Sequence, residues 1–541
     1  MVQFIGGEPT LDPDLPRLVR HALGKGLKVY VYSNLVHVTR PLWELFSQPG
    51  MLLGTSWYSA DPGKHAEITG SRASYARTRA SIAEAVRRGI PVRAAIVEIT
   101  KDQGIEQAAA ELRRLGVTDI RVRPSQGMLT SAPAARPTTV LRPATATTAR
   151  PLRAGEMTGR MDWEPHAEQL AGEVTDPMSR WRPLVASTPR HVFVPRWWQW
   201  ADPQGWTAWE GPADARRWMN AAYCDRTLIT RLGPAHADHA QPGDHPDGRP
   251  TSSATQPGLV VQMYRHAGIT DGADILDVGT GSGYGCALLA RRLGDVRVTS
   301  VDVDDYLVKA AAERLAGIGL HPDVTVCDAT GPLPGSYDRI VSMMSVTPVP
   351  ASWLAALRPG GRLVTVLAGT GLIVTADKMP DGGAAGRIEW DRAGFMAARS
   401  GPDYPPSLLD EFPAARDGEG EQVSAGRYPV VSIGNAWELY SMLGVTVPGV
   451  QDHYQESGDG QRTAWLLHPD GSWARATGTA DGPPVVCQSG PRRLWDTVDD
   501  IRHAWLRDGK LPAYGASVTI TPDGSVHLKR GRWQATIPAA G

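Results

Sequence analysis

Cysteine is scarce in this chain, and its scarcity excludes several kinds of stabilisation. The 541 residues contain four cysteines (Cys224, Cys286, Cys327 and Cys487), which lie far apart and form no C-x-x-C pair. Such spacing indicates neither a disulfide framework nor a zinc site. We therefore expect reduced, mostly buried thiols, with Cys286 and Cys327 acting as small apolar side chains rather than redox groups.

Long apolar runs and a surplus of one charge are also missing. No stretch of about 18 residues is both apolar and free of charge, so no transmembrane helix is predicted. The first residues lack the basic and apolar segments of a secretion signal, which makes the cytosol the expected location. With 56 Lys and Arg against 57 Asp and Glu, the net charge of −1 argues against nucleic acid or an anionic membrane as a partner.

Changes in composition and in the helix and strand patterns along the chain predict several domains, as the length also suggests. Helix and strand patterns alternate over 1–127, for example in "LVRHALGKG" followed by "KVYVYSN", and indicate a parallel sheet or barrel segment covered by helices. A linker rich in Pro, Ala and Thr is predicted at 128–160. An α/β domain that begins with Trp-rich helices is expected at 161–390, and a small α+β domain at 391–541.

The predicted C-terminal domain has its own local signals. "WLLHPDGSWARA" and "VTITPDGSVHL" each place a Pro-Asp-Gly-Ser turn between alternating strands, which indicates two hairpins. Between them, Leu494, Val498, Ile501 and Trp505 share one face of a helix that should end near Gly509.

The segment with the most candidate ligand-binding residues is "ADILDVGTGSGYGCALLARRL", which begins at Ala273. An apolar strand ends near Asp277, and a turn with glycines at 279, 281 and 283 leads into an amphipathic helix. Glycine is needed where the backbone turns tightly and a ligand approaches it. The next predicted strand ends in Asp302, where an acidic group can hold two ribose hydroxyls. A third leads to Asp328, which is well placed for an adenine amino group.

Proteins that bind NAD share the glycine turn and the acidic strand end, although their turn is usually GxGxxG and this one is GxGxG. The series "LDVGTGSGY…VDVD…CDA…LRPGGRLV" resembles the class I S-adenosylmethionine-dependent methyltransferases. The resemblance implies a Rossmann-like core and S-adenosyl-L-methionine as cofactor. It also implies these cofactor-binding residues: Asp277, Gly279, Thr280, Gly281, Ser282, Gly283, Asp302, Val303, Asp328 and Ala329.

Three segments upstream of the glycine turn make the resemblance more specific, because all three resemble segments of a single methyltransferase family. "STPRHVFVP" (187–195), "YCDRTLIT" (223–230) and "SSATQP" (252–257) resemble, in the same order, segments of the protein L-isoaspartyl O-methyltransferase family. In that family a Ser-x-Pro hydroxyl faces the substrate carboxylate. Position by position this hydroxyl falls on Thr255, and Ser253 or Ser252 takes the role if the loop is shifted. The family also places Asp225 beside the pocket, while a helix-capping role for it is an equal alternative.

The chemistry of a carboxylate acceptor agrees with these residue types. A carboxylate is already ionised at neutral pH, so its attack on a sulfonium methyl group needs no general base. The enzyme must align the oxygen, the methyl group and the sulfur and remove water from the nucleophile. A small hydroxyl such as that of Thr255 can orient a carboxylate without a strong charge.

Several patterns have a plainer interpretation beside the functional one. His236, His239 and His245 have acidic neighbours that would suit a metal, but the surrounding Pro and Gly favour an insert beside the active site. The Trp-rich segment "RWWQW", with Trp206, Trp209 and Trp218 nearby, can clamp a peptide, but core packing and helix docking are favoured. Asp277 is also a candidate for ordering the glycine turn through backbone N–H groups.

The N-terminal region carries a second resemblance. "FIGGEPT", "VYSNL" (31–35) and the segment from "GTSWYSADPG" onward resemble the radical S-adenosylmethionine enzymes, in which the GGEP segment contacts the cofactor. Those enzymes hold an iron–sulfur cluster through a C-x-x-x-C-x-x-C loop upstream of GGEP. Here the first cysteine is Cys224. We therefore expect a partial barrel, the remnant of a radical-type domain.

Together these patterns predict an α/β methyltransferase that esterifies an isoaspartyl or aspartyl carboxylate of a protein or peptide. Two substrates are open: damaged proteins in general, or one ribosomally made peptide. The alternatives are a non-catalytic peptide-binding or scaffold protein and a methyltransferase acting on another nucleophile.

Overall fold

The computed structural model describes residues 2–4, 9–11, 15–36, 38–69, 74–98, 103–124, 162–201, 204–241, 243–401, 403–404, 407–408, 412–458 and 460–539. The chain divides into two compact units, Met1–Leu141 and Arg142–Gly541. The predicted linker at 128–160 and most of the GGEP segment lie outside the described residues.

The first unit is built on a parallel sheet whose strands follow one another in chain order, as the alternating sequence patterns predict. Amphipathic helices cover it and bury apolar side chains such as Val19, Ile82 and Leu112. The strands are β1 (Val2–Phe4), β2 (Val29–Tyr32), β3 (Met51–Trp57), β4 (Val92–Glu98) and β5 (Asp119–Pro124), and the helices are α1 (Leu15–Gly24), α2 (Arg40–Phe46), α3 (Pro62–Thr69), α4 (Ser74–Arg87) and α5 (Ile105–Arg114).

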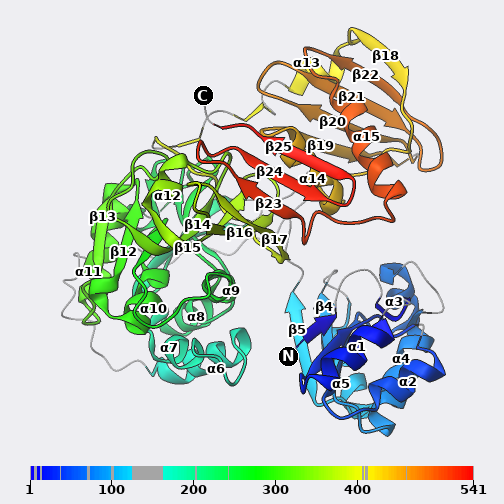
Figure 1. Ribbon diagram of the computed structural model, residues 1–541, viewed down its shortest axis with the longest axis horizontal. Helices are drawn as coiled ribbons and strands as arrows, with labels where there is room; N and C mark the ends of the chain where they lie inside the picture. Colours follow the sequence, from blue (N-terminus) through cyan, green and yellow to red (C-terminus); the bar gives the residue numbers. More distant parts are fainter. Residues whose placement is uncertain are drawn as a thin grey trace. The chain divides into compact units, whose positions relative to one another are not determined.

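The second unit contains a long mixed sheet with the order β13-β12-β11-β14-β15-β16-β17-β23-β24-β25 (Figure 1). The strands β11 to β15 are parallel, as in other sheets that alternate with helices. Its first elements are β11 (Ile275–Val278), α10 (Tyr284–Leu293), β12 (Val298–Asp302), α11 (Asp305–Ala316), β13 (Asp323–Val326), β14 (Tyr337–Val346), α12 (Ala351–Ala356), β15 (Leu357–Leu367), β16 (Leu372–Lys378) and β17 (Ala384–Arg392).

A smaller antiparallel sheet precedes this one in the chain and has the order β10-β8-β6-β7, with β9 paired to β8. Its last strand, β10, leads directly into α9, which precedes β11. The elements of this part are α6 (Glu164–Val174), α7 (Arg182–Ser187), the 3-10 helix η2 (Arg190–Phe193), β6 (Arg196–Ala201), β7 (Gly205–Glu210), α8 (Ala215–Ala222), β8 (Leu228–Leu232), β9 (Ala235–His236), β10 (Pro250–Ala254) and α9 (Pro257–His266).

The Trp-rich segment differs from its prediction as helix. "RWWQW" forms strand β6, paired with β7 so that Trp197 lies opposite Trp209, and their rings stack at 6.4 Å. Because successive side chains of a strand point to opposite faces, Trp197 and Trp198 enter two different apolar clusters. The indole of Trp218, on α8, donates to the carbonyl oxygen of Val194 at 2.8 Å.

The last part of the chain contributes to two sheets. One is antiparallel, with the order β18-β22-β21-β20-β19. Both Pro-Asp-Gly-Ser segments form the predicted hairpins, β20–β21 and β23–β24. The elements are α13 (Phe412–Asp417), β18 (Gln422–Ala425), α14 (Trp437–Thr446), β19 (Gln451–Glu456), β20 (Arg462–Leu467), β21 (Trp473–Gly478), β22 (Val485–Ser489), α15 (Leu494–Arg507), β23 (Ser517–Ile520), β24 (Val526–Arg530) and β25 (Trp533–Ile537).

The long sheet continues across the boundary that the sequence predicts near residue 390. Strand β23 pairs with β17, so the red strands β23 to β25 lie beside the methyltransferase-like strands in Figure 1. One apolar cluster accordingly contains Leu276 and Leu363 as well as Val518 and Leu528. Pairing between strands that are distant in the chain cannot be recognised from the sequence around either strand. The change in residue pattern near residue 390 therefore suggested a separate domain. No helix in the described part of the chain is long and apolar enough to span a membrane.

Shortening a core side chain at the far end of this sheet should weaken the methyltransferase-like strands as well. Leu528 on β24 is 1% exposed, and Leu528→Ala should cost about 2–5 kcal/mol of unfolding free energy. Because the apolar cluster is shared, hydrogen exchange of the β11 amides, measured by mass spectrometry, should become faster. Val423→Ala, at a residue 63% exposed on β18, should leave that exchange unchanged. Faster exchange confined to β23–β25 would contradict the shared core.

Candidate functional site

The glycine turn adopts the conformation that its sequence requires. Between β11 and α10, Gly279, Gly281 and Gly283 have φ values of 93°, 52° and 93°, which side chains rarely tolerate. A Cβ atom on Gly281 would lie 3.1 Å from the carbonyl oxygen of Ser253, and one on Gly283 would lie 3.0 Å from Cβ of Ala311. The turn therefore packs against the segment of the predicted hydroxyls on one side and against α11 on the other.

Asp302, not Asp277, orders this turn through a backbone N–H group. Its Oδ2 accepts a hydrogen bond from Gly281 N at 2.9 Å, and its Oδ1 accepts one from Asp304 N at 3.1 Å. Asp277 is 1% exposed and instead accepts from the hydroxyl of Ser300 at 2.8 Å and from that of Tyr264 at 3.5 Å. Burial raises the pKa of Asp277 to about 7, although both hydroxyls act to lower it.

A single cavity brings the predicted residues together. It is lined by every predicted cofactor-binding residue except Gly283, which packs on α11, and by the hydroxyl candidates Ser252, Ser253 and Thr255. Asp302 ends β12, and Asp328 follows β13, the neighbouring parallel strand, so both residues lie at the same edge of the sheet. The lining thus combines glycine backbone and carboxylates on one side with small hydroxyls on the other.

The other wall of the cavity was missed by sequence reasoning. The segment Gly394–Arg399 and Tyr404, which were assigned to the C-terminal domain, line the cavity, as do Thr227 and Thr251. Ser345, on β14, holds this segment: its N–H donates to Met396 O at 2.8 Å, and its carbonyl accepts from Ala398 N at 2.8 Å. The bonds join distant parts of the chain, and no motif in the sequence signals them.

A buried arginine positions the hydroxyl segment. Arg190, from the "PRH" motif, is 0% exposed, and its two Nη atoms donate to backbone carbonyls at 2.5–3.3 Å. The carbonyls belong to Ala222, Cys224, Arg226, Ala254 and Thr255. Arg190 therefore ties the Tyr-x-Asp segment to the residues beside α9, and burial lowers the pKa of its guanidinium.

Asp225 has the capping role rather than a place in the cavity lining. Its Oδ1 accepts from Gly258 N at 2.7 Å, at the start of α9, and its Oδ2 accepts from Gln256 Nε2 at 2.9 Å. Thr255 directly precedes this capped helix start, so Asp225 fixes the backbone next to the hydroxyl candidate. Such a cap accepts one of the N–H groups that a helix start leaves unpaired.

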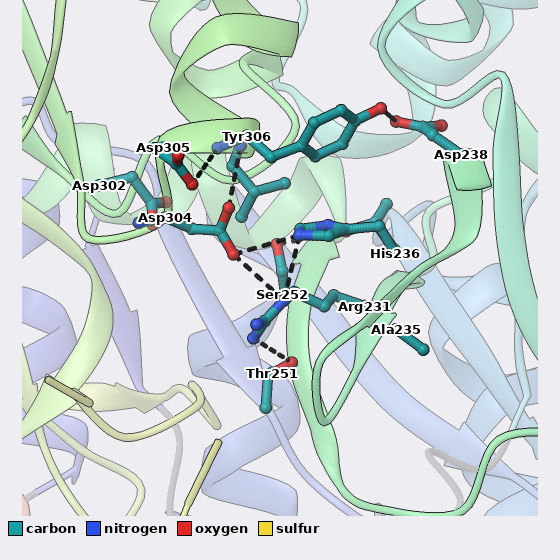
Figure 2. A network of polar contacts seen from close by, with 12 residues as sticks. Arg231, Ala235, His236, Asp238, Thr251, Ser252, Asp302, Asp304, Asp305 and Tyr306 are labelled. Carbon is teal, nitrogen blue, oxygen red and sulfur yellow. Dashed lines mark hydrogen bonds and ion pairs between the residues drawn. The ribbon is translucent and has the colours of Figure 1, made fainter. Parts of the chain in front are cut away.

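One of the three histidines, His236, belongs to a polar network around Asp304 (Figure 2). His236 Nε2 and Arg231 Nε lie 3.3 and 3.1 Å from Asp304 Oδ2, while Leu307 N donates to Asp304 Oδ1 at 3.1 Å. Burial alone would raise the pKa of Asp304, but the hydrogen bonds and charges of His236, Leu307 N and Arg231 lower it to about 2.

The remaining polar groups of this region pair with α11. Tyr306 donates its hydroxyl hydrogen to Asp238 at 3.0 Å (Figure 2). The ring of His239 lies 4.2 Å from that of Tyr306. His245 lies apart from them, with Nδ1 3.2 Å from Trp206 O. Within the described residues, no three His, Cys, Asp or Glu side chains are grouped to hold a metal ion. His236 and His239 therefore pack on each other, at 5.8 Å between ring centroids, and on Tyr306, while His245 is held elsewhere.

The cavity-bearing part of the chain also resembles known proteins. Residues 242–387 match the family model of protein-L-isoaspartate(D-aspartate) O-methyltransferase (PCMT). The match confirms the predicted methyltransferase core. The protein-L-isoaspartate O-methyltransferase of Thermotoga maritima is 30% identical over 122 residues, which are 22% of this chain and 38% of the relative. That of Anaeromyxobacter dehalogenans is 37% identical over 114 residues, 20% of this chain and 54% of the relative.

These matches cover only part of each protein. The chain spans 38% and 54% of the length of these two curated relatives. A solved structure named protein-L-isoaspartate O-methyltransferase overlaps with a TM-score of 0.37 at 14% identity and covers 70% of this chain and 100% of its own. The first unit and the small C-terminal sheet lie outside the residues that match the family model.

Removing the guanidinium of Arg190 should loosen the hydroxyl segment. Arg190→Met leaves several buried carbonyls without a donor, each at a cost of about 1–3 kcal/mol, so the unfolding free energy should fall by at least about 3 kcal/mol. Urea denaturation measures this loss. Arg416→Met, at an exposed arginine paired with exposed Asp417, removes the same charge and should leave the stability nearly unchanged. An equal loss of stability in both variants would contradict the conclusion that Arg190 holds the two segments together.

The buried Asp277 should give the protein a characteristic pH dependence. Its folded pKa of about 7 lies above the value near 4 expected for an unfolded chain, so the folded state binds more protons between them. Its contribution to stability is therefore fully present below about pH 4 and is lost as pH rises through about 7. Asp277→Asn should gain stability relative to the wild type from pH 5 to pH 8, by about 2 kcal/mol. Urea unfolding of both proteins at both pH values tests this.

Proposed function

We propose that the second unit transfers a methyl group from S-adenosyl-L-methionine to an isoaspartyl or aspartyl carboxylate of a protein or peptide. One observation supports this most: a single cavity is lined both by the glycine turn with Asp302 and Asp328 and by the hydroxyls of Ser253 and Thr255. The family match at residues 242–387 supports the same reaction.

The cofactor side of the cavity fits S-adenosylmethionine. Gly279 and Gly281 line it without side chains, so a ligand can approach their backbone, and a Cβ on Gly281 would crowd the carbonyl oxygen of Ser253. Asp302 uses its oxygens on two backbone N–H groups, yet each carboxylate oxygen has a further lone pair for a ribose hydroxyl. Asp328 accepts from Thr330 N at 2.9 Å and retains an oxygen for an amino group. When bound, the cofactor supplies a methyl group on a positively charged sulfur.

The acceptor side needs alignment rather than a base. The acceptor carboxylate is ionised at neutral pH, and one of its oxygens forms the new bond to the methyl carbon while the bond from carbon to sulfur breaks. Thr255 and Ser253 offer hydroxyl hydrogens that can orient the other oxygen. The segment Gly394–Arg399 supplies another part of the cavity wall, where bound substrate would displace water from the acceptor oxygen.

The reaction is tested with the purified full chain, methyl-labelled cofactor, and an isoaspartyl and an aspartyl peptide. Label that alkali releases as methanol supports the carboxylate ester, whereas base-stable label would point to another nucleophile. Methylation restricted to one dedicated peptide would exclude general repair. Absence of S-adenosylhomocysteine binding would instead favour the scaffold alternative.

Two substitutions should test the acceptor side and the cofactor side of the cavity independently. Thr255→Val should lower ester formation by about tenfold or more with little change in the S-adenosylhomocysteine Kd, because the hydroxyl is lost but the cofactor side is intact. Asp302→Ala should raise that Kd by about tenfold or more, since it removes the acceptor of Gly281 N. Thr255→Ser serves as the conservative control and Ser253→Ala as the alternative. Activity lost in Ser253→Ala alone would move the orienting role to Ser253.

For the first unit we propose a partial β/α domain related to the radical S-adenosylmethionine enzymes. Its parallel strands in chain order support this relationship. Residues 1–127 contain no cysteine, so they have no thiolate with which to hold a cluster.

A further inference from the structure

The cavity contains one positively charged side chain that the methyl-transfer chemistry does not require. Among the described lining residues, the charged groups are Asp277, Asp302 and Asp328 on the cofactor side and Arg399 on the opposite wall. Arg399 stands at the end of the segment Gly394–Arg399, which Ser345 fixes to β14. A cation held at this position selects what enters the cavity.

The guanidinium of Arg399 is buried but incompletely paired. Its side chain is 8% exposed, and Nη1 donates to Gly401 O at 2.5 Å. The nearest carboxylate oxygen, Asp304 Oδ2, is 3.5 Å from Nη2, which is long for a charged hydrogen bond. A guanidinium has five N–H donors, so most of those of Arg399 have no acceptor among the described residues.

Asp304 is poorly able to satisfy Arg399. The same Oδ2 atom lies 3.1 Å from Arg231 Nε and 3.3 Å from His236 Nε2 (Figure 2). Both atoms are closer to it than Arg399 Nη2 is. The other oxygen, Oδ1, accepts the N–H of Leu307 at the start of α11. Arg231 is held further by Thr251, another residue of the cavity lining. The network therefore anchors Arg399 without neutralising its donors.

We propose that Arg399 is a carboxylate-binding residue of this cavity, which pairs with an anionic oxygen of a bound ligand. The inference rests on the proposed function, which supplies two ligands that carry carboxylates. One source is the peptide, through its acceptor carboxylate or an acidic neighbour, and the other is the amino-acid end of S-adenosylmethionine. A planar guanidinium matches a carboxylate in a two-bond arrangement that lysine does not reproduce.

Binding measurements on the full-length protein distinguish the two sources. Calorimetry gives the Kd of S-adenosylhomocysteine and of 5′-methylthioadenosine, which lacks the amino-acid end. Fluorescence anisotropy gives the Kd of labelled isoaspartyl peptides, with Glu or Gln beside the acceptor, in saturating S-adenosylhomocysteine. If the peptide is the source, Arg399→Met should raise the peptide Kd by about 10- to 100-fold and leave that of S-adenosylhomocysteine unchanged. An effect confined to the Glu peptide identifies the neighbour as the partner.

If the cofactor is the source, Arg399→Met should weaken S-adenosylhomocysteine by about the same factor and leave 5′-methylthioadenosine unchanged. Arg399→Lys should retain part of the affinity, and Arg416→Met should retain all of it. Ligand affinities within about twofold of the wild type in Arg399→Met would overturn the proposal, as would failure of the wild type to bind either ligand. If Arg399→Met does not fold, Arg399→Gln, whose amide can still donate to Gly401 O, carries the same comparison.

The outcome is separable from that of the proposed function. Ligand binding that depends on Arg399 without any methyl ester would overturn the methyl transfer alone. Ester formation with binding that ignores Arg399 would overturn the carboxylate-binding role alone.

Discussion

The geometry of the cavity depends on one buried guanidinium. Arg190 has no carboxylate partner in the described structure. Its Nη atoms donate instead to backbone carbonyls of two segments that are far apart in the chain. Burial of the two Nη atoms is tolerated because they are paired with these carbonyls, so the two segments are held in one arrangement. The buried Nε has no hydrogen-bond partner among the described residues. The Thr255 backbone, the cap on α9 and the contact of the glycine turn with Ser253 all follow from that arrangement.

The two acidic residues of the motif have different physical roles. Asp277 is enclosed and bonded to hydroxyls, so it links β11 to Ser300 on β12 inside the protein. Asp302 is placed at the end of β12, where it both shapes the turn and lines the cavity. Removing the charge of Asp277 therefore acts mainly on stability, whereas changes at Asp302 act on the site itself.

The sequence predicted those parts of the structure that local rules determine. The β11–turn–α10 unit, the Pro-Asp-Gly-Ser hairpins and the helix of Leu494 and Val498 each carry their signal within a few residues. The Trp-rich strand β6 was expected as part of a helical region, because a short apolar run has no clear period. The wall Gly394–Arg399 and the pairing of β17 with β23 could not be predicted from a single sequence, since each joins segments with many residues between them. The roles assigned to the site residues, including Thr255 and Ser253, remain predictions.

The position of β23 in the long sheet has a consequence for how the protein is made. The parallel strands from β11 to β15 are complete before β18 to β25 are made, and β17 keeps an open edge until β23 emerges from the ribosome. Contacts of high sequence separation form slowly, because a long loop must close first. An open edge strand is a template for pairing with other chains. The nascent protein is therefore most exposed to aggregation while the small sheet β18–β22 is being translated, and a chaperone would have most to protect during that interval.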